Sequence, residues 1–492
     1  MLDKRNFYIN GKWVSPVKSN DLEVINPSSE TPFAVISLGD QIDTDNAVNA
    51  ANNAFSDWST VPKNDRIALV ERILAQYEAR ADDMAEAIST EMGAPIDLAK
   101  VQQVPTGVRH TKNFIKACKN FQFERKLGDH APNDRIIYEP IGVCGLITPW
   151  NWPMNQVTLK VIPALLTGCT MVLKPSEIAP LSSYLFAEFL HDVGVPAGVF
   201  NLVNGDGPGV GRQLSGHKDI DMISFTGSTR AGIDISKNAA NTLKRVHLEL
   251  GGKGANIIFP DAPNNTVRRS VLHCFNNSGQ SCNAPTRMLV HRDIYNDVVS
   301  TAGDVAKTAY VRSADQASDG SDGGTLDPKG GKHIGPVVSK IQFEKIQNLI
   351  QQGIDEGARL IVGGTGRPEG LNNGYYVKPT VFADVSNGMS IAQQEIFGPV
   401  LSIIPFDTEE EAIDIANDTV YGLTNYVQSQ DGALRNRICK RLRSGMVEMN
   451  GKMLGDGSPF GGIKSSGNGR EGGAWGLEDF MEVKSITGWA GE

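Results

Sequence analysis

The sequence predicts an α/β protein with more than one domain, built on parallel sheets covered by helices. The chain has 492 residues, which is more than one hydrophobic core accommodates, since cores stop growing near about 250–300 residues. From residue 136 onward, short apolar runs bounded by Gly and Pro alternate with helical patterns, as they do in βαβ units. The 52 glycines are an excess that suits tight turns and ligand-binding loops.

The amino-terminal part is predicted to be largely helical. Residues 40–118 carry apolar side chains at helical spacing, with Asp43 and Thr44 opening one helix and Lys63 opening the next. After residue 136 the apolar runs predict strands. The helices between these strands are expected at Ser182–Val193 and Gly209–Leu214.

The alternating pattern restarts after residue 250, which predicts a second α/β domain. Its strands are expected at 254–260, Arg287–His291, Arg359–Val362, Pro399–Pro405 and Gly445–Glu448. The segment 312–332 is rich in Ser, Asp and Gly and is predicted to be a mobile surface loop. An acidic metal loop is the alternative, but the segment lacks the spaced ligands and terminal Glu of a calcium loop.

Composition excludes several classes of partner. A net charge of -9 argues against nucleic acid or an anionic membrane as the main partner, because phosphate binding needs clustered Lys and Arg. The amino terminus has no signal-peptide pattern, and the longest uncharged apolar stretch, Val161–Leu173, is too short to span a bilayer. A cytoplasmic protein is therefore expected. The six cysteines show no disulfide or zinc-ligand spacing, so five are expected to be small buried side chains and no metal site is expected.

Five polar segments follow apolar runs and are expected at the carboxyl ends of strands, where open α/β sheets bind ligands. In the first, GQSCNAPTR, Cys282 follows the apolar run Ser270–Phe275 and precedes Pro285. This context predicts a partly exposed loop thiol, either a nucleophile or an inert cysteine. In the second, LELGGKGAN, Glu249 precedes two glycines. Alone it would more often be a surface or ion-paired carboxylate, but beside a cysteine it supplies a general base for water.

The third of the five segments, SFTGSTRAG at 224–232, is a candidate for phosphate binding, and so is a separate glycine-rich stretch, NGDGPGVG at 204–211. Gly227 and Ser228 begin a helical pattern, so the N–H groups and the hydroxyl there could hold a phosphate. Neither segment has the G-x-G-x-x-G spacing of a dinucleotide fingerprint. A simple glycine-rich turn is an equal alternative for each.

Two further segments carry polar groups after apolar runs. In VLKPSE, Lys174 and Glu177 could hold ribose hydroxyls, or they could form a surface ion pair worth only about 0–1 kcal/mol. In TPWNWP, Asn151 could donate to an oxyanion, an effect of about 3–4 kcal/mol when the donor is pre-organised. Capping of the following helix is the alternative role for Asn151.

Taken together and in this order, the five segments resemble the aldehyde dehydrogenase superfamily, specifically its NAD-dependent hydrolytic members. Four more segments match: YINGKWV at 8–14, INPSSE at 25–30, QEIFGPV at 394–400 and PFGGIKSSGNGREGG at 459–473. The resemblance implies a Rossmann-like cofactor domain, an α/β catalytic domain and a small β oligomerisation flap, in a homodimer or homotetramer. The implied bounds are 1–118 with 140–250 for the cofactor domain, 251–469 for the catalytic domain, and 119–139 with 470–492 for the oligomerisation flap.

The resemblance also implies roles for site residues. Cys282 matches the nucleophile, Glu249 the general base, and Asn151 the oxyanion donor together with the backbone N–H of Cys282. NAD is the implied cofactor, and the residues that match its site are Thr148, Trp150, Lys174, Ser176, Glu177, Gly207, Phe225, Gly227, Ser228, Leu250, Glu395 and Phe397. The residues that match the substrate tunnel are Trp152, Gln156, Leu159, Ser281, Asn283, Lys452, Leu454 and Phe460.

The implied reaction oxidises an aldehyde to a carboxylic acid through a thioester on the cysteine, with water as the second substrate. Glu177 predicts NAD over NADP, because a carboxylate repels a 2′-phosphate. Gln156 and Asn283 predict a small polar aldehyde, while Lys452 could favour an anionic one or be a solvated lysine. Two rivals are a CoA-acylating semialdehyde dehydrogenase, against which Glu249 argues, and a cofactor-free cysteine hydrolase, which would need a paired histidine.

Overall fold

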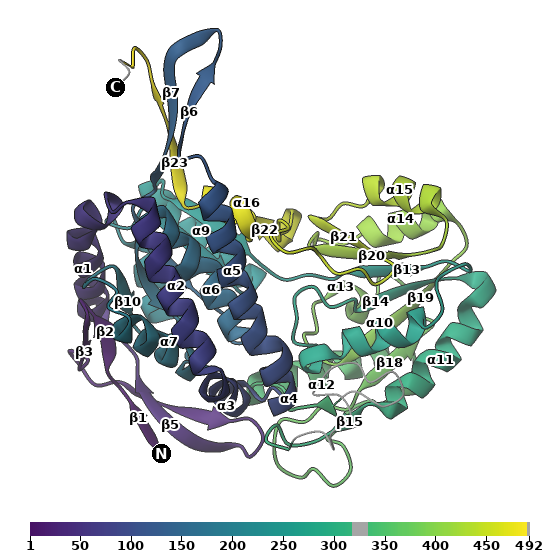
Figure 1. Cartoon of the computed structure of the whole chain (residues 1–492). Coiled ribbons are helices and arrows are strands. Elements are labelled where there is room, and N and C mark those ends of the chain that lie inside the picture. The colour runs from purple at the N-terminus through teal and green to yellow at the C-terminus, as the bar shows by residue number, and fades with distance from the viewer. Residues whose placement is uncertain (317–332, 490–492) are drawn as a thin grey trace.

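The computed structural model describes residues 1–316 and 333–489. Two α/β bodies lie side by side, and a narrow β flap projects from the first of them (Figure 1). Most of the segment 312–332, predicted to be a mobile loop, lies outside the described residues. No described helix is long and apolar enough to cross a lipid bilayer.

The first body is built on an eight-stranded sheet in the order β22-β12-β11-β8-β9-β10-β2-β3. The five strands from β12 to β10 are mutually parallel. From β8 the chain moves through β9 to β10 on one side, and later through β11 to β12 on the other. Such a reversal of strand order leaves a ligand-binding crevice at the carboxyl ends of the strands, here between β8 and β11. The bounds are β2 Phe7–Ile9, β3 Lys12–Val14, β8 Val143–Ile147, β9 Thr170–Lys174, β10 Phe200–Leu202, β11 Met222–Thr226, β12 Arg245–Glu249 and β22 Gly467–Asn468.

Helices pack around this sheet (Figure 1). The strands contribute continuous buried runs, as expected when both faces of a parallel sheet are covered. The α-helices are α1 Gln41–Ser59, α2 Lys63–Ala79, α3 Ala81–Met92, α4 Ile96–Leu98, α5 Val104–Asn120, α6 Pro153–Thr167, α7 Leu181–Asp192, α8 Arg212–Gly216 and α9 Thr229–Ala239. Two π-helical turns adjoin these helices: η1 Ala99–Gln103 connects α4 to α5, and η2 Gly207–Gly211 leads into α8.

The start of α1 differs from the prediction. The carboxylate of Asp40 accepts the N–H groups of Ile42 and Asp43, and the carboxylate of Asp43 accepts the N–H of Asp40. This reciprocal capping box makes Asp40 the N-cap. The predicted opening at Asp43 and Thr44 is therefore wrong, because both residues lie inside the first turn. The predicted start of α2 at Lys63 is confirmed.

The second body contains a seven-stranded sheet in the order β17-β18-β19-β14-β13-β20-β21, in which β17 alone runs antiparallel. Its strands are β13 Ala255–Ile258, β14 Arg287–His291, β17 Arg359–Val362, β18 Thr380–Ala383, β19 Val400–Phe406, β20 Thr424–Gln428 and β21 Met446–Met449. Its helices are α10 Thr266–Cys274, α11 Tyr295–Thr308, α12 Lys340–Asp355, α13 Ser390–Gln393, α14 Glu409–Asn417 and α15 Gly432–Arg441, with a 3-10 turn, η4, at Asn276–Gly279.

One prediction for this body is wrong. The apolar run Ser270–Phe275 was expected to form a strand that leads into the cysteine loop. It instead lies in helix α10, except for Phe275, which directly follows the helix. A short apolar run fits a buried strand and a buried helical turn equally well, so periodicity could not separate the two. The cysteine loop therefore follows a helix and leads into the amino end of β14.

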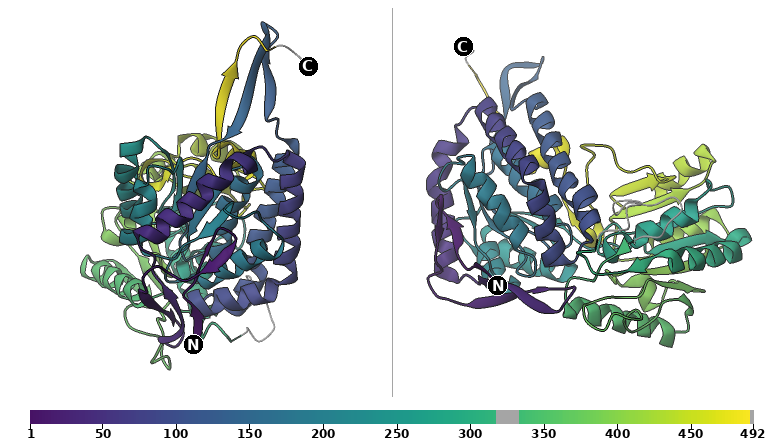
Figure 2. Two further views of the ribbon diagram at one scale, coloured as in Figure 1. Left: turned by 90° about the vertical axis from the view of Figure 1, so that its left-hand side faces the viewer. Right: turned by 60° about the horizontal axis from the view of Figure 1, so that its bottom comes forward.

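A three-stranded sheet forms the flap and rises clear of the helices in both turned views (Figure 2). It consists of β6 Glu124–Gly128, β7 Ala131–Pro140 and β23 Met481–Ile486, in the order β23-β7-β6. The helix before β23 is α16 Gly473–Glu478. Smaller sheets join β1 Leu2–Lys4, β4 Asp21–Asn26 and β5 Thr31–Ser37, and join β15 Tyr310–Val311 to β16 His333–Ile334.

The cysteines depart from expectation at one position. Cys118, Cys144, Cys169 and Cys274 are buried, whereas Cys439 is half-buried on α15. Cys282 is also half-buried, which agrees with the partial exposure predicted for it.

Candidate active site

The candidate site lies where the two sheets meet. Strands of the first sheet bring residues to their carboxyl ends: Thr148 follows β8, Lys174 ends β9, Gly227 follows β11 and Glu249 ends β12. The second body instead contributes residues that come before its strands, since Cys282 precedes β14 and Glu395 precedes β19. The expectation that all five motifs follow strands is therefore wrong for the cysteine loop, which sits at the amino end of its strand.

The cysteine loop is held in an unusual backbone conformation. Asn277, Ser278 and Gly279 have φ values of 52°, 58° and 74°, the left-handed region that non-glycine residues rarely adopt. A Cβ at Gly279 would come within 2.1 Å of the carbonyl oxygen of Gly398. The Ser278 hydroxyl donates to the carbonyl of Gly335 at 2.9 Å, which helps to hold the turn. Backbone strain of this kind persists only where the surroundings enforce it, and it clusters at functional sites.

Asn151 is bonded directly to this loop. Its side-chain Nδ2 donates to the carbonyl of Gln280 at 3.0 Å. The backbone carbonyl of Asn151 accepts the amides of Gln103 and Asn277, at 3.1 and 2.8 Å. An amide nitrogen carries two hydrogens, so one N–H of buried Asn151 is still available to an oxyanion. This placement does not correspond to simple capping of helix α6, which has no side-chain cap.

Two glycines link Glu249 to the cysteine loop. A Cβ at Gly252 would lie 2.4 Å from the carbonyl oxygen of Cys282, and one at Gly251 would lie 2.5 Å from Oε2 of Glu395. The N–H of Gly252 donates to Oε1 of Glu395 at 2.8 Å. Only residues without a side chain allow these approaches. The segment after β12 thus packs against both the cysteine loop and the loop before β19.

The electrostatics at Cys282 oppose spontaneous ionisation. Burial raises the pKa of the thiol above its ordinary value, and the carboxyls of Glu395 and Glu249 raise it further. Burial also raises the pKa of Glu249, to about 7. Neither carboxyl oxygen of Glu249 has a hydrogen-bond partner among the described residues. A buried carboxyl that makes no hydrogen bond with the described residues and has a pKa near neutrality is suited to accept a proton as a general base.

Several of the residues matched to the cofactor gather at the carboxyl ends of β9 and β11. Lys174 Nζ lies 3.2 Å from Oε2 of Glu177 and also donates to the carbonyl of Pro175 at 3.0 Å. Exposed Ser228 is the N-cap of α9, and its hydroxyl accepts the N–H of Ala231 at 3.3 Å. The N-terminus of α9 therefore presents N–H groups and a partial positive charge beside Gly227, as phosphate binding requires.

The remaining matched cofactor residues border this region. Phe225 is the residue before the last one of β11, and a Cβ at Gly227 would lie 2.4 Å from the Phe225 ring. Trp150 and Phe397 pack edge to face, with ring centroids 5.5 Å apart. Thr148, Ser176 and Leu250 are buried, whereas Gly207 is exposed at the start of η2.

Two buried polar side chains that lack hydrogen-bond partners are evidence that this region binds a polar ligand. Thr226 Oγ1 and Lys253 Nζ are buried and have no hydrogen-bond partner among the described residues. Burial lowers the pKa of Lys253 to about 7, and Arg287 lowers it further. A buried unpaired polar group costs about 1–3 kcal/mol. The structure therefore leaves donors and acceptors that a bound dinucleotide could satisfy. In the described part of the chain, no three His, Cys, Asp or Glu side chains gather as metal ligands.

The matched tunnel residues fall into two groups. Gln156 and Leu159 are buried on α6, and Trp152 Nε1 donates to the Ser281 hydroxyl at 2.8 Å. The carbonyl of Asn283 accepts the hydroxyl of Tyr426. In contrast, Lys452 and Leu454 are exposed on the segment after β21, and the Lys452 ammonium makes no bond with the described residues. Phe460 is half-buried and forms an isolated bridge with Glu471.

Several polar residues at the site went unrecognised in the sequence. Gln103 ends a π-helical turn, and its Nε2 donates to Oδ1 of Asn277 at 3.2 Å as well as to Asn151. Tyr426 lies on β20, a strand that was not predicted. His247 lies 3.7 Å from the carboxyl of Glu249. The only available signal was a polar side chain within an otherwise apolar pattern, which is too common to single out these three.

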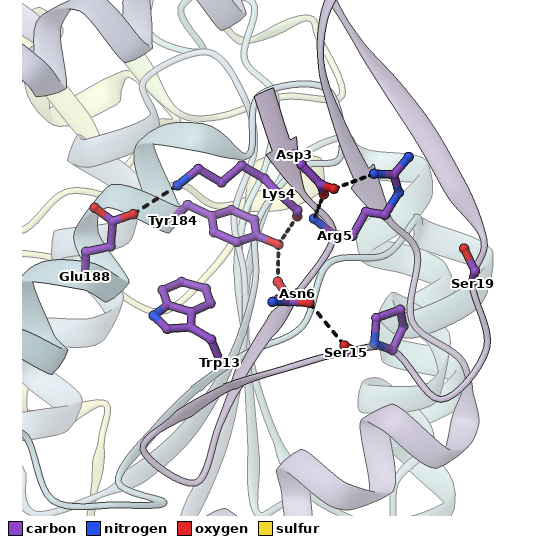
Figure 3. A pocket seen from close by; sticks show the side chains of 10 residues that line it. Asp3, Lys4, Arg5, Asn6, Trp13, Ser15, Ser19, Tyr184 and Glu188 are labelled. Carbon is purple, nitrogen blue, oxygen red and sulfur yellow. Dashed lines mark hydrogen bonds and ion pairs between the residues drawn. The ribbon is translucent and has the colours of Figure 1, made fainter. Parts of the chain in front are cut away.

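A separate hollow of about 640 Å³ lies at the amino-terminal strands, and none of the candidate site residues line it (Figure 3). The ring of Trp13 stacks on that of Tyr184, with centroids 5.3 Å apart. Lys4 pairs with Glu188 at 3.0 Å, and Arg5 pairs with Asp3 at 2.7 Å. Among the described residues that line the hollow, every charged side chain is therefore already paired.

Comparison with known proteins identifies the relatives of this chain. The model of the aldehyde dehydrogenase family matches residues 13–486. A 3-succinoylsemialdehyde-pyridine dehydrogenase from Pseudomonas sp is 50% identical over 493 residues, covering 100% of both chains. An aldehyde dehydrogenase structure from Bartonella henselae has a TM-score of 0.96 at 60% identity, covering 99% of this chain and 100% of that one. A mutant aldehyde dehydrogenase C from Pseudomonas syringae, solved with NAD⁺ and octanal, has a TM-score of 0.93 at 45% identity, covering 99% and 97%.

Proposed function

Because the chain belongs to the aldehyde dehydrogenase family and is an NAD-dependent aldehyde dehydrogenase, we propose that it works through a thioester on Cys282. The overall reaction oxidises an aldehyde to a carboxylic acid. In the proposed route, water activated by Glu249 hydrolyses the thioester. The observation that carries the proposal is the convergence of Cys282, Asn151 and Glu249, which are joined through Gln280 and Gly252.

The first half of the reaction uses the cysteine loop. The half-buried thiol of Cys282 gives its proton to solvent, and the resulting thiolate sulfur bonds to the aldehyde carbon, whose carbonyl oxygen becomes an oxyanion. The free N–H of Asn151 and the backbone N–H of Cys282 stabilise that charge. Bound NAD supplies a hydride acceptor for the oxidation. The residues that would hold it are Lys174 and Glu177 at the adenosine ribose, Gly227 and Ser228 at the pyrophosphate, and Glu395 at the nicotinamide ribose.

The second half of the reaction releases the acid. The carboxylate of Glu249 takes a proton from a water molecule, whose oxygen attacks the thioester carbon. The C–S bond then breaks, and the sulfur of Cys282 leaves as the thiolate. Glu249 is suited to this step because its pKa of about 7 lets it both accept and release a proton near neutral pH.

The direct test of the proposed route is NADH formation by the purified protein with a panel of aldehydes, together with identification of the product. We expect NADH and the carboxylic acid in equal amounts, without added coenzyme A. NADH formation that begins only when coenzyme A is added, with an acyl-CoA as the product, would overturn the hydrolytic route.

For the substrate we propose a small polar aldehyde. Buried Gln156 has an amide oxygen with no hydrogen-bond partner among the described residues, which leaves an acceptor for a polar substrate group. The relatives differ in what they act on: one is a pyridine semialdehyde dehydrogenase, and another was crystallised with octanal. The panel therefore includes short polar aldehydes, octanal and a pyridyl semialdehyde. A higher kcat/KM for octanal than for every polar aldehyde would contradict the proposal.

Cofactor preference is expected to depend on Glu177. A carboxylate beside the ribose repels a 2′-phosphate, and two charges about 4 Å apart interact by about 1 kcal/mol in water and about 4 kcal/mol at a partly buried site. The Glu177→Ser variant should therefore raise the ratio of kcat/KM for NADP to that for NAD by at least about tenfold. Steady-state kinetics with both cofactors measure this ratio. An unchanged ratio would place the 2′-hydroxyl away from Glu177.

Removal of the Asn151 amide is expected to slow the oxidation. The Asn151→Ala variant loses one oxyanion donor, which costs about 10²–10³ in kcat at comparable sites. KM should change little, because the interaction forms mainly in the transition state. Rapid-mixing measurement of the first NADH turnover reports this step. A large rise in KM with unchanged kcat would instead indicate a displaced cysteine loop, since Asn151 also bonds Gln280.

We further propose that the flap formed by β6, β7 and β23 joins two or four copies of the chain. Val483 and Leu127 on this flap are exposed apolar side chains, at 61% and 40%. A thin three-stranded sheet without its own core gains stability when another surface covers it. Light scattering of the intact protein distinguishes a dimer or tetramer from a monomer, which would contradict the proposal.

A further inference from the structure

His247 and Glu249 occupy alternate positions of β12, so their side chains project from the same face of the strand. Both side chains are buried, with 3% and 2% exposure. Nε2 of His247 lies 3.7 Å from Oε1 of Glu249, and Nδ1 lies 2.5 Å from Oδ2 of Asp479. The imidazole ring is therefore enclosed between two carboxyl groups.

This arrangement determines the charge of the ring. A neutral imidazole gains little from a nearby carboxylate, whereas an imidazolium is attracted to it by charge. A carboxyl group at each nitrogen therefore favours the imidazolium. Burial by itself lowers the pKa of His247, but the contacts with Asp479 and Glu249 more than offset this and raise it to about 9. His247 thus carries a positive charge at neutral pH.

Asp479 is built to hold this contact. It lies between α16 and β23, and its Oδ2 also accepts the backbone N–H of Arg470 at 3.2 Å. The guanidinium of Arg245 donates to the backbone carbonyl of Asp479 at 2.8 Å. A Cβ at Gly469 would lie 2.9 Å from Nδ1 of His247 and 3.0 Å from Oδ2 of Asp479, so the absence of a side chain there leaves room for the pair.

A second ion pair faces Glu249 from other elements. Lys160 of α6 lies 2.6 Å from Oε1 of Glu471, which precedes α16, and both side chains are buried. Glu471 raises the pKa of Glu249 while Lys160 lowers it, so the two effects oppose each other. This pair therefore does little to offset the burial that disfavours the charged form of Glu249.

We propose that His247, held in its charged form by Asp479, is a positioning residue for the general base and favours the ionised form of the Glu249 carboxyl near neutral pH. The inference rests on the proposed hydrolytic role of Glu249. Burial alone favours the protonated carboxylic acid, which cannot take a proton from water. The separation of 3.7 Å exceeds a hydrogen bond, so the effect is electrostatic and needs no proton transfer between the two side chains.

The test is the pH dependence of thioester hydrolysis in the absence of NAD. A chromogenic aryl acetate acetylates the thiol of the intact protein, and mass spectrometry then follows loss of the acetyl group. A plot of hydrolysis rate against pH should fall on its acid side, where Glu249 becomes protonated, and we call this part the acid limb. In His247→Gln the acid limb should move to higher pH by roughly 1–3 units, because an opposite charge within about 4–6 Å shifts a carboxyl pKa by this amount. The rate on the alkaline plateau should be retained. Asp479→Asn should move the limb in the same direction, because His247 loses the carboxylate that holds its charge.

The matched control is Asn468→Ala. Asn468 Oδ1 accepts the N–H of Leu248 at 2.9 Å, so its loss disturbs β12 without changing any charge. Its acid limb should coincide with that of the unsubstituted protein. An unmoved limb in His247→Gln, or an equal shift in Asn468→Ala, would overturn the inference. Should His247→Gln fail to fold, an unmoved limb in Asp479→Asn overturns it instead.

The proposed hydrolytic role of Glu249 is tested separately, with the Glu249→Gln variant. Glu249→Gln should retain the acetyl group at every pH tested. If Glu249→Gln loses the group as fast as the unsubstituted protein, the base lies elsewhere and the proposed function is wrong at this step. If Glu249→Gln retains the group while His247→Gln shows no shift, only the role of His247 is wrong.

Discussion

Replacement of Cys282 with alanine is expected to abolish aldehyde-dependent NADH formation, with a loss on the order of 10⁴-fold or more. Every proposed step uses the sulfur of Cys282, first as the nucleophile and then as the leaving group. No other thiol of the described chain is placed to replace it, because Cys118, Cys144, Cys169 and Cys274 are buried and Cys439 lies on α15, outside the candidate site. NAD affinity and thermal stability should be nearly unchanged, since Cys282 is half-buried on a loop.

The matched control for this variant is Cys439→Ala. Cys439 is the other half-buried thiol, it lies on α15, and its sulfur donates to the carbonyl of Asn436 at 3.4 Å. This control should keep full activity. NADH formation by Cys282→Ala at a rate near that of the control would mean that the aldehyde is oxidised without a thiohemiacetal on Cys282. Calorimetric titration with NAD separates such a result from loss of the cofactor site.

Local sequence patterns predicted much of the fold because short apolar runs were bounded by residues that break strands. The strands β14 and β17 occupy Arg287–His291 and Arg359–Val362, as predicted. The strand β20 was missed because it is a central strand with polar side chains. Asn425 on β20 accepts the backbone N–H of Ala255, and Gln428 donates to Asn256. Such buried polar residues are tolerated because neighbouring strands satisfy them.

The candidate site could be predicted only as a set of separate motifs. Their order along the chain pointed to Cys282, Glu249 and Asn151, since each stands in a distinctive segment. The contact of His247 with Asp479 could not be predicted, because it depends on the folding of the segment after α16 against β12. Likewise, the helical conformation of α10 places the cysteine loop at the amino end of β14, a position that the run Ser270–Phe275 did not reveal.

Replacement of Glu249 with glutamine is expected to separate oxidation from hydrolysis. Glutamine keeps the shape of the side chain but cannot take a proton from water, so the thioester should form and persist. The first turnover should release about one NADH per active subunit, and steady turnover should then fall by roughly 10²–10⁴-fold. Mass spectrometry of the stopped protein should find the acyl group on Cys282. Added coenzyme A should not restore turnover.

The matched control is Glu91→Gln, the same change at another buried carboxyl whose pKa burial raises to about 7. Glu91 accepts the N–H of Leu181 on Oε2 and the N–H of Ser182 on Oε1 at the start of α7, so a glutamine keeps one of these two hydrogen bonds. This control should turn over steadily and show no burst. A burst in both variants would point to slow product release and not to a lost base. Steady turnover by Glu249→Gln only when coenzyme A is present would make the acylating reaction the native one, because a thiol would then replace water as the acceptor of the acyl group.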